Sequence, residues 1–168
     1  ALTTFGRDAR TAWPDLLERQ VEAMAREPDL CLLGAWAMLI DAEGQEIGPQ
    51  RQVAAHEDIV RDFVRGRDPI TTPGAIMRRW AVDRVGGYRR AFSTAEDYDL
   101  WYRLSEVGRV ANLPEILVSY RLHPGGNSRQ ITTASFDRAV VARICGIARR
   151  RGLPEPLSGD AIDLAAAL

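Results

Sequence analysis

The chain has 168 residues, of which 46% are hydrophobic and 27% are charged, and its formal net charge is −1. This composition is typical of a globular protein with one core, and it excludes a disordered tail or a fibrous repeat. All 22 positive side chains are Arg, but 23 acidic side chains balance them. We therefore expect no nucleic-acid partner, because phosphate backbones select strongly basic surfaces.

The chain carries no signature of secretion or of a membrane span. Its longest apolar run, residues 30–40, is shorter than the roughly 20 residues that a transmembrane helix needs. Cys31 and Cys145 lie far apart in apolar surroundings, which indicates buried thiols in a reducing compartment. We expect a cytoplasmic protein without a transmembrane segment, either free or peripheral to the inner face of a membrane.

The first elements read as a leader, a helix and a strand. Residues 1–13 are polar and unpatterned, so we expect an irregular leader. Residues 14–26 begin with a proline and predict a helix. Its apolar stripe consists of Leu16, Leu17, Val21 and Met24. Residues 30–40 are typical of a buried strand, and Gly34 within it indicates a bulge or a close backbone approach.

The middle of the chain alternates short elements with loops. Residues 41–44 give a turn signal before a return strand that starts at residues 45–47. Further elements are predicted as a helix at 56–65, a loop at 69–73, a strand at 74–77, a helix at 78–85 and a loop at 88–94. His56 precedes two acids, which favours a solvated helix start over a metal site.

The second half predicts a helix at 95–107, strands at 110–113 and 116–122 on either side of Pro114, and a long helix at 132–151. Ser158 is expected to cap a short final helix. No repeat or linker divides the chain. We predict one domain over residues 1–168 of α/β or α+β class. It comprises a leader (1–13), a main region (14–128) and a helical tail (129–168).

The start of the 95–107 helix is rich in acids that have ordinary explanations. Ser93 or Thr94 can cap the helix, and Glu96 completes a capping box with Ser93. Asp99 and Arg103 have the spacing of an ordinary i, i+4 ion pair on a helix surface. Acids in the first helical turn also favour the positive end of the helix dipole.

Asp97 fits those explanations less well. It lies three, four and seven positions before Leu100, Trp101 and Leu104, which places it on the apolar face of the helix. A solvating acid belongs on the opposite face. Asp97 is therefore a candidate for a carboxylate at the edge of a cleft, whose pKa is set by burial and the helix dipole. A structural role for this acid is the alternative.

The strand at 116–122 leads into a second polar group. Alternation places Ser119, Arg121 and His123 on one face, just before the turn at residues 124–126. An Arg beside a His ahead of a glycine-rich turn suits a diphosphate or a metal ion. The alternative is an edge strand with a polar outer face.

Several short motifs follow one another in a set order: Gly86-Gly87-Tyr88, residues 95–104, Asn112-Leu113-Pro114-Glu115 and residues 120–124. This order and spacing resembles the second half of a family 2 glycosyltransferase with a GT-A fold. Parts of residues 14–44 resemble the same family just after its acidic metal-binding motif. The resemblance covers residues 14–128, and the tail matches weakly. It implies a partial GT-A-like mixed sheet flanked by helices.

The resemblance implies transfer of a sugar from a nucleotide-sugar donor to an acceptor hydroxyl, with inversion at the anomeric carbon. In the family, the second acid of the Glu-Asp pair is the general base, which here is Asp97. Glu96 would orient the acceptor or tie down a nearby loop. Trp101 would contribute to the acceptor side or buttress Asp97.

The resemblance also implies a site for the leaving diphosphate. His123 matches a position where some members place a metal-ligating or diphosphate-contacting His, and Arg121 would help to neutralise the diphosphate. The family uses a divalent cation, Mn²⁺ or Mg²⁺, held by an acidic motif. Here that window reads Arg7-Asp8-Ala9-Arg10. Asp8 remains a candidate ligand, but guanidinium groups replace the neighbouring acids and repel a hard cation.

The resemblance further implies a nucleotide-binding half ahead of this region, on the order of 90 residues long. Only 13 residues precede Pro14. We expect a truncated, degenerate or naturally short form that is inactive alone because its donor site is incomplete. A non-catalytic interaction module on the same scaffold, or an unrelated small α/β domain, are the alternatives. We also expect a homodimer, because the absent half would leave an apolar surface uncovered.

Overall fold

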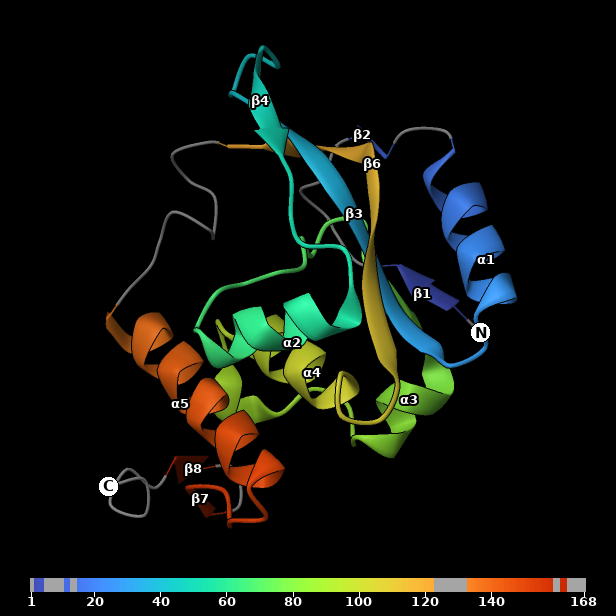
Figure 1. Cartoon of the computed structure of the whole chain (residues 1–168). Helices are drawn as coiled ribbons and strands as arrows, with labels where there is room; N and C mark the ends of the chain where they lie inside the picture. Colours follow the sequence, from blue (N-terminus) through green and yellow to red (C-terminus); the bar gives the residue numbers. More distant parts are fainter. Residues whose placement is uncertain (1, 5–10, 13–14, 123–132, 159–160, 163–168) are drawn as a thin grey trace.

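A mixed β-sheet with helices on both faces forms the centre of the chain (Figure 1). The computed structural model describes residues 2–4, 11–12, 15–122, 133–158 and 161–162. The six-stranded sheet has the order β1-β5-β3-β6-β2, and β4 pairs with β3 outside this path. This is the mixed α/β arrangement that the sequence predicts.

The strands of the sheet are β1 (Leu2–Thr4), β2 (Thr11–Ala12), β3 (Leu30–Ile40), β4 (Glu46–Gln50), β5 (Ile76–Arg78) and β6 (Arg109–Arg121). The helices are α1 (Leu16–Arg26), α2 (His56–Val64), α3 (Arg79–Arg84), α4 (Glu96–Leu104) and α5 (Thr133–Arg150), with a 3₁₀ turn η1 (Arg90–Phe92). The predicted helices and strands between residues 14 and 151 are confirmed within a few residues at each end, apart from the strands around Pro114.

β3 is the centre of the sheet and is buried on both faces. It pairs in parallel with β6 and antiparallel with β4 and β5. Leu33 packs with Met24 of α1, whereas Leu32 belongs to the larger core under α2, α4 and α5. A strand covered on both faces needs apolar residues at every position, which is why residues 30–40 are a continuous apolar run.

The absence of a side chain at Gly34 leaves room for the side chain of Asn112 on the neighbouring strand. Gly34 pairs with Asn112, and a Cβ at Gly34 would lie 2.2 Å from Asn112 Oδ1. The Asn112 amide donates to the carbonyls of Val53 and Pro69, both at 2.7 Å, and so ties two loops to the sheet. The predicted close approach at Gly34 is confirmed.

β6 is one continuous strand, so the prediction of two strands around Pro114 is wrong. The register of the parallel pair passes from Leu113 opposite Ala35 directly to Ile116 opposite Trp36. Pro114 and Glu115 thus bulge out of the ladder. A proline has no N–H to donate, and a bulge lets the strand continue across it.

α1 is rotated relative to the predicted stripe. Leu16 and Met24 are buried as predicted, but Leu17 is 52% and Val21 is 42% exposed. Gln20 is buried instead, and its amide donates to the carbonyl of Gly74 at 2.6 Å. A polar residue is stable on the buried face because its amide hydrogen is paired there.

Both ends of the chain differ from the predicted pattern. The expected irregular leader contributes β1 and β2, which pair antiparallel with β5 and β6. Where a helix capped by Ser158 is predicted, the described residues form two short antiparallel strands, β7 (Leu157–Ser158) and β8 (Ala161–Ile162), and the rest of that predicted helix lies outside the described residues. Short strands of two or three residues lack the alternation that makes a strand readable in sequence.

The largest core lies between the sheet and α2, α4 and α5. Seven of the nine residues of α4 are buried, since this helix contacts β3, α3, α5 and η1. α4 therefore carries no solvated face of the usual kind. Within the described residues, no helix is long and apolar enough to cross a membrane.

Candidate functional site

Asp97 is a half-buried carboxylate at the start of α4. The Thr72 hydroxyl donates to its Oδ2 at 2.9 Å, and the Tyr88 hydroxyl donates to its Oδ1 at 3.2 Å. Each oxygen keeps further capacity to accept a hydrogen bond. The side chain is held in place but still partly open to solvent.

Three segments meet at this carboxylate. The loop between α2 and β5 supplies Thr72, the loop between α3 and η1 supplies Tyr88, and α4 supplies Asp97. The N-cap of α4 is Ala95 without a side-chain cap, so the predicted cap and capping box at Ser93 or Thr94 are not formed. Thr94 instead has φ +74°, a strained conformation for a β-branched residue.

Burial is the main cause that raises the pKa of Asp97, and the charge of Glu96 raises it further. The hydrogen bonds from Thr72 and Tyr88 stabilise the ionised form and oppose this rise. Burial and the charge of Asp97 also raise the pKa of Tyr88, so that its hydroxyl keeps its proton and remains a donor. The carboxylate is thus a stronger base than an ordinary aspartate.

Two more acids surround Asp97. Asp68 precedes the loop that carries Thr72; partial shielding by the surrounding protein and the charge of Asp97 raise its pKa, although the residue keeps exposed surface. Glu96 is half-buried, and its Oε2 has no hydrogen-bond partner among the described residues. This oxygen has almost no accessible surface, so in this structure a ligand hydroxyl does not reach it.

Asp99 lies behind this site in a buried ion network. It is 0% exposed and accepts hydrogen bonds from both Arg89 and Arg103. Arg89 also donates to Glu155 at 2.6 Å, and Arg149 lies 3.1 Å from Glu155. The expected Asp99–Arg103 pair is confirmed, but it is a core interaction rather than a surface one, because α4 is enclosed on all sides.

Arg103 connects this network to the loop that carries Tyr88. Its Nη1 donates to the carbonyl of Val85 and its Nη2 to the carbonyl of Gly87, both at 2.7 Å. Gly86 and Gly87 both have positive φ, at +79° and +69°, which L side chains rarely adopt. The sequence therefore needs glycine at the turn that delivers Tyr88 to Asp97.

The other predicted site residues have different surroundings. Trp101 is fully buried within the large core, which suits packing behind Asp97 and not contact with an acceptor. Arg121 donates to the carbonyls of Asp41 at 2.9 Å and Ala42 at 2.7 Å, so its described contacts lie in the 41–44 turn. These contacts share no residue with those of Asp97.

The predicted metal ligands Asp8 and His123, and the turn at 124–126, lie outside the described residues. Within the described ranges, no group of three or more His, Cys, Asp or Glu side chains could hold a metal ion. The divalent cation therefore stays a prediction. His56 begins α2 as predicted but is half-buried rather than fully solvated, since its Nδ1 accepts the Val110 N–H at 3.2 Å and burial lowers its pKa.

Sequence reasoning missed three residues that build the Asp97 site. Thr72 and Asp68 belong to a loop without periodicity, and nothing in the sequence links them to a residue 25 positions or more away. Tyr88 was within reach, since it follows the glycine pair that forms part of the resemblance. A Gly-Gly pair indicates a tight turn, and the residue after such a turn was a candidate for a fixed position.

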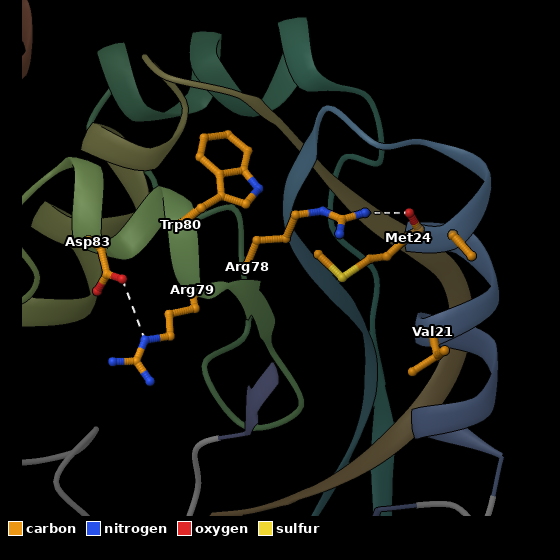
Figure 2. A pocket seen from close by; sticks show the side chains of 7 residues that line it. Val21, Met24, Arg78, Arg79, Trp80 and Asp83 are labelled. Atoms are coloured by element: carbon orange, nitrogen blue, oxygen red, sulfur yellow. Dashed lines mark hydrogen bonds and ion pairs between the residues drawn. The ribbon is translucent and has the colours of Figure 1, made fainter. Parts of the chain in front are cut away.

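A separate hollow of about 550 Å³ lies between α1 and α3 (Figure 2). Val21 and Met24 border it from α1, and Trp80, which is 44% exposed, from α3. Arg78 crosses its floor and donates to the carbonyls of Met24 and Leu30. Its lining is largely apolar side chains with an Arg79–Asp83 ion pair at the rim.

The chain is similar to three known proteins. It is 29% identical over 109 residues to the amylovoran biosynthesis glycosyltransferase AmsE of Erwinia amylovora. The matched region covers 64% of this chain and 40% of that protein. It is 28% identical over 121 residues to an uncharacterized glycosyltransferase of Haemophilus influenzae, covering 67% of this chain and 37% of the relative.

The third relative is an O-antigen biosynthesis protein, RfbC, of Myxococcus xanthus. It is 28% identical over 137 residues, or 80% of this chain and 10% of that protein. The chain thus spans less than half the length of the curated relatives it matches. No model of a known protein family matches it. These similarities relate the chain to glycosyltransferases.

Proposed function

We propose that this chain forms the acceptor side of an inverting, family 2-type glycosyltransferase with a GT-A-like fold, and that Asp97 is its general base. The single observation that carries the proposal is the half-buried, hydrogen-bonded Asp97 with a raised pKa. A base works best when its pKa approaches the working pH, and burial moves Asp97 in that direction. The glycosyltransferase relatives support the reaction class.

In the proposed reaction, the Asp97 carboxylate takes the proton of an acceptor hydroxyl. The acceptor oxygen then bonds to the anomeric carbon of the donor as the bond from that carbon to the diphosphate oxygen breaks. The nucleoside diphosphate leaves with the electron pair. Glu96, the residue before the base, is proposed to orient the acceptor or to hold a nearby loop. Arg121, and His123 outside the described residues, remain candidates for the diphosphate.

The pH profile of transfer tests the base assignment. Asp97 acts as a carboxylate, so activity is full above its pKa and is lost as the pH falls through it. Because burial raises that pKa, we expect the acidic limb to lie above the ordinary Asp value of about 3.9. Release of UDP or GDP from a panel of nucleotide-sugars, followed in the longest natural form of the protein, gives the profile.

Circular dichroism over the same pH range is the control for unfolding. An activity that stays level down to the pKa of an ordinary aspartate would contradict the assignment.

A second candidate role is a self-associating module, and the hollow between α1 and α3 favours it. Val21 and Trp80 expose apolar surface at this hollow. A second copy of the chain would remove this surface from water. We expect sedimentation velocity to show a dimer at micromolar concentration, and Trp80→Glu to weaken it at least about tenfold, or roughly 1.4 kcal/mol.

Leu153→Glu is the matched control for that experiment, because Leu153 is 56% exposed but does not line the hollow. It should leave the dimer intact. A wild-type chain that sediments as a monomer throughout the micromolar range would rule this role out.

A further inference from the structure

The position of the Tyr88 hydroxyl depends on the turn that ends α3, where the N–H groups of Gly86 and Gly87 donate to the carbonyls of Asp83 and Val82. Tyr88 follows two glycines in left-handed conformations, and the residue is 39% exposed. Glycine leaves the backbone more freedom than any other residue. These backbone bonds tie the turn to α3, and a hydroxyl 3.2 Å from Asp97 depends also on how the turn is fixed to α4.

Arg103 fixes the turn to α4 from inside the protein. Its side chain is only 6% exposed, and its Nε and Nη2 donate to Asp99 at 3.0 and 2.7 Å. The same guanidinium reaches the carbonyls of Val85 and Gly87. Its planar fork thus fixes the loop backbone on both sides of Gly86 relative to α4.

The residue after Tyr88 is tied to the same carboxylate. Arg89 donates to Asp99 through Nε at 3.0 Å and through Nη2. Both neighbours of Tyr88 are therefore fixed. Arg103 holds the carbonyl of Gly87, and Asp99 holds the guanidinium of Arg89. Since Asp97, Asp99 and Arg103 all belong to α4, one rigid helix carries both the carboxylate and the anchors of its donor.

We propose that Arg103 is a positioning residue, which holds the carbonyls of Val85 and Gly87 against buried Asp99 and thereby keeps the Tyr88 hydroxyl on Asp97. The catalytic meaning of this arrangement rests on the proposed function of Asp97. The geometric arrangement is independent of that proposed function. It can be tested by a measurement that requires no enzymatic activity. The measured quantity is the pKa of the Asp97 carboxyl group.

The test is a carbon-13 NMR titration of the Asp97 carboxyl in the 168-residue chain. The Tyr88 hydrogen bond favours the carboxylate, so Tyr88→Phe should raise the pKa of Asp97 by roughly half a unit to one unit. Arg103→Lys keeps the positive charge beside Asp99 but cannot reach Asp99 and both carbonyls together. It should raise the pKa of Asp97 by a similar amount.

The double variant separates positioning from general destabilisation. With Tyr88 already replaced, Arg103→Lys should raise the pKa of Asp97 no further. The other charged neighbours of Asp97, namely Glu96 on α4 and Asp68 from the loop before β5, are unchanged throughout. Arg79→Lys is the matched control, since Arg79 also forms an i, i+4 pair with an aspartate but is exposed.

A folded Arg103→Lys chain with an unchanged pKa at Asp97, or pKa shifts that add in the double variant, would overturn the proposal. Nitrogen-15 NMR of the wild-type guanidinium gives a second test if that variant does not fold. Restricted rotation with distinct Nη signals for Arg103 is expected, and one averaged signal would contradict the anchoring. Full transfer activity in Asp97→Asn would instead refute the proposed base and leave the positioning result standing.

Discussion

Asp97→Asn is expected to lower kcat for sugar transfer by about 10²- to 10⁴-fold, the usual contribution of a general base. Asparagine has nearly the same shape and can still accept the hydrogen bond from Thr72, but it cannot take a proton from an acceptor hydroxyl. The loss should fall on kcat more than on KM, because proton transfer occurs in the transition state. The measurement is the initial rate of nucleoside diphosphate release in the longest natural form of the protein.

Asp58→Asn is the control for that measurement. Asp58 is an exposed acid in the first turn of α2, paired with Arg61, and it makes no described contact with the Asp97 site. It should leave the rate unchanged. An Asp97→Asn enzyme within a few-fold of wild-type kcat would end the assignment of Asp97 as the base.

Asp99→Asn is expected to reduce the free energy of unfolding by about 3–5 kcal/mol, which is the typical cost of breaking a buried ion pair by removing one partner. Asp99 is fully buried, and both Arg89 and Arg103 depend on it. The substitution keeps the side-chain shape, so a cavity does not add to the effect. It leaves the guanidinium of Arg103 charged and unbalanced in the core. Urea denaturation measures the change.

The matched control is Asp83→Asn in α3. Asp83 forms an i, i+4 pair with Arg79 at 3.4 Å, with side chains 65% and 71% exposed. A surface pair of this kind contributes about 0.5 kcal/mol or less. Equal effects of the two substitutions would show that the Asp99 network is no stronger than a surface ion pair.

The two ion pairs, Asp99–Arg103 and Arg79–Asp83, show that the sequence does not predict whether an ion pair is buried. Both pairs have the same spacing of four, so the spacing alone does not distinguish a buried ion pair from a surface one. Only the packing of α4 against β3, α3, α5 and η1 distinguishes them. Burial changes the contribution of the ion pair to the free energy of unfolding, because water screens an exposed charge and cannot reach an enclosed one.

The sequence by itself determined the central strand, the helices and the candidate base. A continuous apolar run predicts a strand buried on both faces, as in β3, and the spacing of Asp97 to Leu100, Trp101 and Leu104 puts an acid on an apolar helix face. These are local patterns, set by the backbone period and by burial. The resemblance to glycosyltransferases also came from ordered short motifs, and the related proteins agree with it.

The tertiary structure alone decided what surrounds Asp97 and what anchors it. Thr72 lies 25 residues away in sequence and meets Asp97 only because the loop before β5 folds over the start of α4. Arg103 reaches the Tyr88 loop across 16 and 18 residues, through carbonyl groups that every residue type carries. Contacts with a backbone carbonyl leave no mark on the partner's side chain, so no sequence pattern records them.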